Sequence, residues 1–279
     1  MNEKIVMSAP CRIHITPLDV QLHDNKILAY SIAFSIQVPR IIITDSKPVI
    51  VPSNLDYIDK GIGARILSSV METIYHILKE SGHVDLDKVL NTITLPLYRG
   101  VDIITLFHGG LILACEVRKE DKVIDLVPLL RCTPDYGIVL YIPLKQKITK
   151  KEISIEGNLS ASLMKECIKL INGVLSNEFK LFIKSLRRIE KLLQYIRLKS
   201  YGSKYSWDQG EELSEYLQKK HEIDLLCQTG SGPILYTLFE NYQQALTKYR
   251  EIKDPVKAKF NVEVLVSRVD NMGLRIRVH

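Results

Sequence analysis

The sequence has 279 residues, of which 46% are apolar and 25% are charged, and its formal net charge is +6 at pH 7. These proportions are close to the average for folded domains, so they exclude a disordered or fibrous chain and allow two modest domains or one large one. The mild positive excess fits a protein that handles anionic small molecules, and it is too diffuse to require a nucleic acid partner.

The first half of the chain predicts strands interrupted by one strong helix. Runs rich in Ile, Val and Tyr predict strands at residues 27–38, 40–44, 105–117 and 138–142. An amphipathic helix is predicted by apolar residues at helical spacing, which are Ile66, Leu67, Val70, Met71, Ile74, Ile77 and Leu78. Gly82 closes this helix, and a short second helix is expected over residues 87–92.

The second half of the chain has a mainly helical pattern. Helices are predicted at residues 160–198, with a break at Asn172-Gly173, and at residues 210–220 and 242–252. Strands are predicted at residues 224–227, 261–267 and 274–278. A polar, lysine-rich stretch at residues 145–155 indicates a domain boundary, which divides the chain into residues 1–150 and 151–279. Because strands and helices mix without regular alternation, we expect an α+β fold.

The cysteines and the apolar segments indicate where in the cell the protein is expected to be. Five cysteines without a Cys-x-x-Cys pair argue against a disulfide framework or a cysteine-rich zinc site, and they favour a reducing environment. No stretch approaches the roughly 20 apolar residues that a membrane helix needs, and the N-terminus lacks an apolar signal core. We therefore expect a cytoplasmic protein without a membrane partner.

Three separated segments carry residues suited to binding an anion, and the first is a strand. Arg12, His14 and Thr16 alternate with isoleucines, so they share one face of that strand. A guanidinium, an imidazole and a hydroxyl on one face can hold an anion together. The alternative is a half-buried strand whose polar side faces water, for which such alternation is common.

The second and third segments are rich in glycine. Lys60 and Arg65 bracket Gly61 and Gly63 at the start of the predicted helix, where exposed backbone amides and the helix dipole favour negative charge. The third segment, Gln228-Thr229-Gly230-Ser231-Gly232-Pro233, follows an apolar strand, and its glycines permit a tight turn. Each of the two, taken alone, also fits an ordinary glycine-rich turn.

Taken together and in this order, the three segments resemble the three motifs of the GHMP kinase superfamily. Ala9-Pro10-x-Arg12 resembles the first motif, Gly61-x-Gly63 before a long helix resembles the phosphate-binding loop, and Gly230-Ser231-Gly232-Pro233 resembles the third motif. Asn271-Met272-Gly273-Leu274 is similar to the ending common in that superfamily. The resemblance implies a two-domain GHMP-kinase-like α+β fold, with a ribosomal-protein-S5-domain-2-like N-terminal domain and a ferredoxin-like C-terminal domain.

Within the superfamily, the chain is similar to the archaeal β-ribofuranosylaminobenzene 5′-phosphate synthase family. The similarity is carried by Arg12-Ile13-His14-Ile15-Thr16-x-x-Asp19, by Gly100 followed by His108-Gly109-Gly110, and by residues 179–189. That family joins phosphoribosyl pyrophosphate to an aminobenzoate or hydroxybenzoate and releases pyrophosphate and carbon dioxide, on the route to methanopterin-type cofactors. The resemblance implies a phosphorylated small molecule as substrate, and it leaves a homodimer open.

The resemblance also implies roles for individual residues. Arg12, His14 and Asp19 would line the reacting end of the substrate, and Asp19 would help to hold Mg²⁺, a hard cation suited to carboxylate and phosphate oxygens. The residues expected to bind phosphate or the rest of the substrate are Thr16, Lys60, Gly61, Gly63, Ala64, Arg65, Gly100, His108, Gly230, Ser231 and Gly232.

Two departures from the family pattern leave the activity open. Arg65 stands where the family loop has small residues, so it either contacts the phosphate or blocks it. Asp102, in a segment with fewer glycines than expected, would repel a phosphate beside it. The alternatives to phosphoribosyl transfer are an ATP-dependent small-molecule kinase and a non-catalytic paralogue that binds a ligand or a partner chain.

Overall fold

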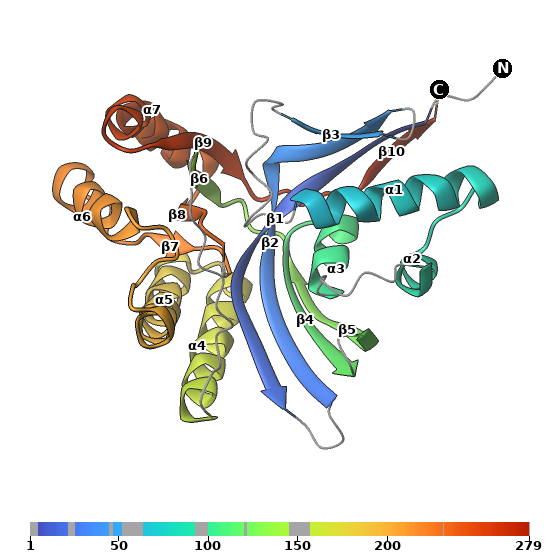
Figure 1. Ribbon diagram of the computed structural model, residues 1–279, viewed down its shortest axis with the longest axis horizontal. Coiled ribbons are helices and arrows are strands. Elements are labelled where there is room, and N and C mark those ends of the chain that lie inside the picture. Colours follow the sequence, from blue (N-terminus) through green and yellow to red (C-terminus); the bar gives the residue numbers. More distant parts are fainter. Residues whose placement is uncertain are drawn as a thin grey trace. The chain divides into compact units, whose positions relative to one another are not determined.

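The computed structural model describes residues 5–21, 26–44, 47–51, 64–92, 100–119, 122–144, 157–230 and 232–278 (Figure 1). The chain divides into two compact units, a first unit of Met1–Thr133 with Val269–His279 and a second unit of Pro134–Arg268. This division differs from the expected boundary near residue 150. Strand β6 (Gly137–Pro143) pairs inside the sheet of the second unit, and the last strand, β10 (Arg275–Val278), pairs with β1 (Ile5–Gln21) of the first.

The first unit is built on an antiparallel sheet, which in the described residues has six strands. Their order is β10-β1-β2-β4-β5, with β3 also paired to β2. The remaining bounds are β2 (Lys26–Thr44), β3 (Lys47–Val51), β4 (Leu111–Lys119) and β5 (Lys122–Cys132). The strand expected at residues 27–38 and that at 40–44 are both part of β2. The sequence does not predict β5.

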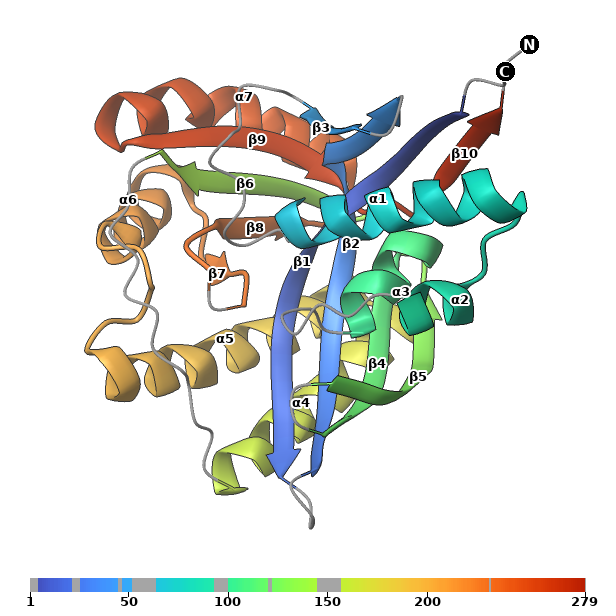
Figure 2. The same ribbon diagram turned by 45° about the vertical axis from the view of Figure 1, so that its right-hand side comes forward.

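Helices cover one face of this sheet. Helix α1 (Ala64–Ser81) and helix α3 (Gly100–His108) pack on β1 and β2, and Figure 2 shows both on the same side of the sheet. Helix α2 (Leu86–Thr92) follows α1 and packs beside it. The apolar stripe that predicts α1 faces the core, with fully buried Leu67, Val70, Met71 and Ile74. The two predicted helices in this part of the chain are thus confirmed by α1 and α2.

Helix α3 is the largest difference from the sequence-based prediction. A strand is predicted over residues 105–117, but residues 100–108 are helical and the strand begins only at Leu111. Val101, Ile103 and Ile104 are β-branched, which locally favours a strand. In the fold these residues are buried, and Val101 and Ile104 pack with Ala33, Ile112 and Ala114. Tertiary packing therefore overrides the local preference.

A close backbone approach joins the end of α3 to the C-terminal segment. Gly109 and Gly273 have φ angles of +66° and +69°, a left-handed region that glycine adopts without strain. A Cβ atom on Gly109 would collide with the carbonyl oxygen of Asp270, and one on Gly273 with that of Phe107. The amide of Gly110 donates a hydrogen bond to the Asp270 carbonyl at 2.6 Å. The Gly109-Gly110 turn therefore has a structural role in seating the end of the chain.

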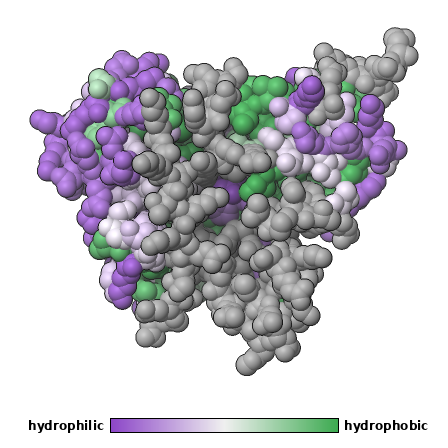
Figure 3. Space-filling view, in the orientation of Figure 1, coloured by the Kyte–Doolittle hydropathy of each residue, from purple (hydrophilic) through white to green (hydrophobic). Residues whose placement is uncertain are grey.

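The second unit contains an antiparallel sheet of four described strands in the order β7-β8-β6-β9. Its further strands are β7 (Cys227–Gln228), β8 (Leu235–Phe239) and β9 (Val262–Arg268), and its helices are α4 (Gly157–Leu175), α5 (Phe179–Tyr201), α6 (Gly210–His221) and α7 (Tyr242–Lys259). One core cluster combines residues of the sheet with Trp207 and with residues of α6 and α7. Figure 3 shows that the outer surface over α6 and α7 is mostly hydrophilic.

Three predicted elements of the second unit differ in extent. The helix break expected at Asn172-Gly173 falls at residues 176–178, because Gly173 continues α4 and lets it approach the backbone of Phe182 on α5. The strand expected at residues 224–227 is reduced to the two residues of β7. Helix α7 continues through Pro255 to Lys259 instead of ending at residue 252. A membrane-crossing helix is absent from the described part of the chain, since none of its helices combines the required length and apolar character.

Candidate functional site

A buried cluster of charged side chains lies between β1 and α3 in the first unit. Arg12 and His14 on β1 both contact the carboxylate of Asp102 on α3. The guanidinium of Arg12 grips both carboxylate oxygens, since its Nε donates to Oδ1 and its Nη2 donates to Oδ2 at 3.2 Å. The Nε2 atom of His14 lies 2.7 Å from Oδ1. Side chains that are about 90 residues apart in the sequence thus form one group.

The position of this cluster follows from strand alternation and from small side chains on β2. Arg12 and His14 are two residues apart on β1, so they share a face, as predicted. Their cross-strand partners on β2 are Ser35 and Ala33. Ala33 packs against α3, and the hydroxyl of Ser35 donates to the carbonyl of Thr105 at 2.7 Å. These small residues let α3 come close enough for its carboxylate to reach β1.

The electrostatic balance of the cluster favours ionised Asp102. Its side chain is 2% exposed, and this burial by itself would raise the pKa of Asp102. The charge of Arg12 and the contact with His14 outweigh burial and hold the pKa of Asp102 well below its ordinary range. Asp102 therefore compensates the charge of Arg12 inside the protein and holds both partners in one orientation. The repulsion expected between Asp102 and a phosphate stays a prediction.

Sequence analysis does not identify Asp102 as the partner of Arg12 and His14. The available signal is a single carboxylate in an otherwise apolar segment, between Val101 and Ile103. An ionised side chain in such surroundings needs a buried counter-charge. The signal predicts that a partner exists, but it does not say which of the chain's cationic residues supplies it.

A second buried carboxylate lies at the N-terminus of α3. The amide of Gly100 donates a hydrogen bond to Oε2 of Glu116 on β4, and Glu116 is 1% exposed. This is the position at which a helix dipole stabilises negative charge. Gly100, expected to contact substrate, thus has its amide bound to a carboxylate of the protein, and a phosphate at this amide would have to displace Glu116.

Part of the predicted phosphate-binding loop lies outside the described residues. Lys60, Gly61 and Gly63 of the loop lie outside the described residues, and so does the side chain of Arg65. The side chains of Thr16 and Asp19, in the first segment, also lie outside them. The backbones of Thr16 and Asp19 are part of β1 and pair with Ile32 and Ala29 of β2. Ala64 is the first residue of α1 and is fully buried. A long helix therefore begins directly after the expected loop, and the loop's role stays a prediction.

The remaining predicted site residues are divided between the two units. His108 is the last residue of α3 and is solvent-exposed, and its pKa is lowered by partial burial and then by the charge of Arg131. Gly230 and Gly232 are in the second unit, whereas Ser231 lies outside the described residues. Gly230 has a φ angle of +54°, and the amide of Gly232 donates to the carbonyl of Thr229 at 3.1 Å. The predicted tight turn is therefore present.

The described residues do not test the Mg²⁺ site that the resemblance implies. Among them, no three His, Cys, Asp or Glu side chains come together as a metal-binding group. The buried carboxylate of Asp102 is already bound by the guanidinium of Arg12 and by a ring nitrogen of His14, which disfavours a further cation at its oxygens. Asp19, the expected ligand, has its side chain outside the described part.

Comparisons with known proteins show the fold. No family model and no curated protein matches the sequence. Among solved structures, homoserine kinase from Cytophaga hutchinsonii matches with a TM-score of 0.66 and 14% identity, covering 99% of this chain and 98% of the kinase. Mevalonate-3-kinase from Thermoplasma acidophilum matches with a TM-score of 0.60 and 12% identity, covering 99% of each chain. Mevalonate diphosphate decarboxylase from Staphylococcus aureus matches with a TM-score of 0.54 and 11% identity, covering 99% of this chain and 98% of the decarboxylase. The chain therefore has the two-domain α+β fold of the GHMP kinases over its full length.

Proposed function

We propose that this chain binds a phosphorylated small molecule and transfers a phosphoribosyl group from phosphoribosyl pyrophosphate to an aminobenzoate or hydroxybenzoate. In this reaction the anomeric carbon of the sugar exchanges its bond to the pyrophosphate oxygen for a bond to a ring carbon. That ring carbon loses its carboxyl group as carbon dioxide, and the bonding electron pair returns to the ring. The chemistry requires stabilisation of a departing anion and close alignment of the arene with the sugar.

The observation that carries this proposal is the arrangement of Arg12 and His14. Both belong to the segment that resembles the synthase family, and Asp102 holds both in one orientation. A guanidinium and an imidazole fixed in this way lose little conformational freedom when an anionic substrate binds, so more of the interaction energy contributes to affinity. Arg12 and His14 are therefore proposed to line the reacting end of the substrate.

Mg²⁺ is part of this proposal by resemblance alone. It would bind oxygens of the pyrophosphate and offset the charge that develops on the leaving group, with Asp19 as its protein ligand. The contributions of Arg12 and His14 do not depend on it.

Two other functions are each favoured by a specific observation. The full-length likeness to homoserine kinase and mevalonate-3-kinase favours an ATP-dependent small-molecule kinase. The pairing of the Gly100 amide with Glu116 favours a non-catalytic protein. In that case the carboxylate of Glu116 permanently fills a place where a ligand anion would bind.

Titration calorimetry with phosphoribosyl pyrophosphate and with ATP, each with and without Mg²⁺, separates the three functions. We expect tighter binding of phosphoribosyl pyrophosphate, and release of pyrophosphate when 4-aminobenzoate or 4-hydroxybenzoate is added. Preferred binding of ATP would identify a kinase instead. Absence of binding for both ligands would indicate the non-catalytic protein.

The matched variants for this titration are Arg12→Lys and Arg188→Lys. Arg12→Lys keeps the positive charge but loses the planar fork that grips Asp102, so we expect about tenfold weaker binding of phosphoribosyl pyrophosphate. Arg188 pairs with Glu166 in the second unit and its side chain is 49% exposed, so its replacement should leave the affinity unchanged. Equal affinities for the two variants would remove Arg12 from the proposed site.

A further inference from the structure

A buried ion pair lies on α5 in the second unit. Arg197 is 1% exposed, and its Nη2 donates to Oε1 of Glu190, which is 3% exposed. Burying two charges is costly even when they are paired, and apolar residues of similar volume often serve stability as well or better. The remaining contacts of the pair therefore matter for what it does.

These contacts hold the turn that follows α5. The Nε of Arg197 donates to the carbonyl of Lys204 at 2.7 Å, and its guanidinium lies over the ring of Tyr205, 5.9 Å from the centroid. The hydroxyl of Tyr205 accepts a hydrogen bond from Nε2 of Gln194 at 2.9 Å and donates to the carbonyl of Leu226 at 3.2 Å. The direction of the chain through residues 203–206 is thus set from α5.

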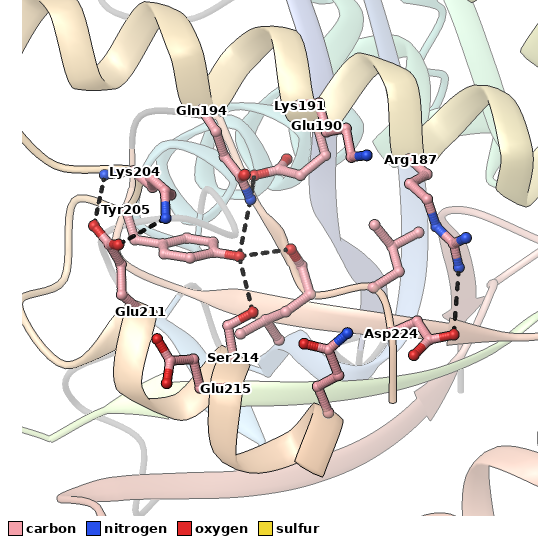
Figure 4. Close-up of a pocket in the computed structure, with 13 residues that line it drawn as sticks. Arg187, Glu190, Lys191, Gln194, Lys204, Tyr205, Glu211, Ser214, Glu215 and Asp224 are labelled. Carbon is pink, nitrogen blue, oxygen red and sulfur yellow. Dashed lines mark hydrogen bonds and ion pairs between the residues drawn. The ribbon is translucent and has the colours of Figure 1, made fainter. Parts of the chain in front are cut away.

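Figure 4 shows part of this turn together with a pocket of about 470 Å³ that its residues help to line. Tyr205 lies beside Gln194 and Ser214. Next to Tyr205, Nζ of Lys204 lies 3.0 Å from Oε2 of Glu211. The turn is therefore held by side chains of α6 as well as α5.

Ser206, which belongs to this turn, binds the glycine-rich segment by hydrogen bonds. The backbone amide of Ser206 donates to Oε1 of Gln228 at 2.7 Å, and the hydroxyl of Ser206 donates to the carbonyl of Gly232 at 2.9 Å. The Nε2 of Gln228, a residue that is fully buried, donates to the carbonyl of Gly230 at 3.2 Å. Glycine has little conformational preference of its own, so bonds to these two carbonyls decide which way the peptide groups of the segment point.

We propose that Ser206 and Gln228, supported by Arg197 and Glu190, are positioning residues that fix the carbonyl groups of Gly230 and Gly232 for ligand binding. This inference rests on the proposed function in one respect, since it takes Gly230 and Gly232 to contribute to the ligand site. It adds three residues from outside the three segments, Glu190, Arg197 and Ser206, and gives Gln228 of the third segment a positioning role. It also gives the buried ion pair a task beyond stability.

The test compares Ser206→Ala with Ser206→Thr and Ser214→Ala. Ser206→Ala removes the hydroxyl that holds the Gly232 carbonyl, and Ser206→Thr restores it. Ser214→Ala removes a hydroxyl of similar exposure that lies 3.4 Å from the Tyr205 hydroxyl on the α6 side and, among the described residues, makes no hydrogen bond to Gly230 or Gly232. For whichever of phosphoribosyl pyrophosphate or ATP the wild type binds, we expect Ser206→Ala to weaken binding about fivefold, the usual effect of one hydrogen bond.

A merely structural role would give a different result. It would lower the melting temperature of Ser206→Ala and leave the affinity of the folded protein unchanged. Positioning predicts weaker binding, a melting temperature no lower than that of Ser214→Ala, and recovery of affinity in Ser206→Thr. Equal affinities for Ser206→Ala and Ser214→Ala would overturn the inference.

Hydrogen exchange of a peptide spanning residues 226–236 gives a readout that needs no ligand. Faster exchange in Ser206→Ala, but not in Ser214→Ala, is expected even if the wild type binds neither ligand and the proposed function fails. Unchanged exchange in both variants would overturn the positioning role independently of that function.

Discussion

At the scale of single residues, Asp102 shows how one side chain organises a buried site. An ionised carboxylate among Val101, Ile103 and Ile104 is costly without partners, and β1 supplies Arg12 and His14. The sequence places Arg12 and His14 on one face because strand alternation is a local property. It does not assign their partner, because α3 reaches β1 only through packing over the small side chains of β2.

Replacing Asp102 by asparagine should strongly destabilise the protein. The substitution keeps the shape of the side chain but leaves Arg12, whose side chain is only 12% exposed, beside a neutral amide, so we expect a loss of about 3–5 kcal/mol in the free energy of unfolding. Urea denaturation measures this loss. Asp224→Asn is the matched control, since Asp224 is 63% exposed and lies 3.8 Å from Arg187, and it should change stability by less than about 1 kcal/mol.

The same pair of proteins also tests the pKa of Asp102. The pKa of Asp102 is lower in the folded state than its unfolded value of about 3.9, so ionised Asp102 contributes its full stabilisation above that value. The contribution is lost as the pH falls toward the folded pKa. Wild type should therefore lose more stability than Asp102→Asn between about pH 5 and about pH 2. Parallel loss in the two proteins would show that Asp102 does not titrate with a depressed pKa.

At the scale of elements, α1 and α3 mark what local patterns can and cannot predict. Helix α1 has a regular apolar stripe that leaves a polar face for solvent, and its position is predicted well. Helix α3 is buried from Gly100 to Leu106, so these residues form no solvent-exposed polar face, and its β-branched residues resemble a strand. A short apolar run does not distinguish the two structures until its tertiary neighbours are known.

Gly109→Ala tests the seating of the C-terminal segment on the end of α3. Both Gly109 and Gly82 have positive φ angles, of +66° and +67°, so alanine at either position costs about 1–2 kcal/mol of backbone strain. At Gly82 the new Cβ would meet nothing within 4 Å, whereas at Gly109 it would collide with the backbone of Asp270 and Gly273. We expect Gly109→Ala to cost more than about 3 kcal/mol and Gly82→Ala no more than about 2 kcal/mol in thermal or urea denaturation. Equal losses would show that the segment yields without cost.

At the scale of the whole molecule, the chain leaves the first unit at Thr133 and returns to it at Val269. Sequence composition indicates a division into two domains and places the boundary in a lysine-rich stretch after β6. It gives no sign that β10 belongs with β1, because antiparallel pairing between strands so distant in the sequence has no local signature. The expected division at residue 150 and the observed one after Thr133 both assign the first two motif segments to one part of the chain and the third segment to the other.

This organisation predicts how fragments of the chain behave. Residues 134–268 contain every described element of the second unit, so we expect this fragment to unfold cooperatively on its own. Residues 1–133 lack β10 and also Asp270, whose carboxylate pairs with Arg40 and Arg275. We expect this fragment to be much less stable than the same residues joined by a short Gly/Ser linker to residues 269–279.

A short linker is feasible because Nη2 of Arg131 lies 2.7 Å from the carbonyl oxygen of Asn271, so the two ends of the first unit are adjacent. Circular dichroism melting curves of the linked and unlinked fragments measure the contribution of the C-terminal segment. Asp270→Asn in the linked fragment removes the negative charge that pairs with Arg40. Because breaking a buried ion pair on one side costs about 3–5 kcal/mol, we expect this variant to be almost as unstable as residues 1–133 alone. Residues 1–133 melting at the same temperature as the linked fragment would contradict the division of the chain into these two units.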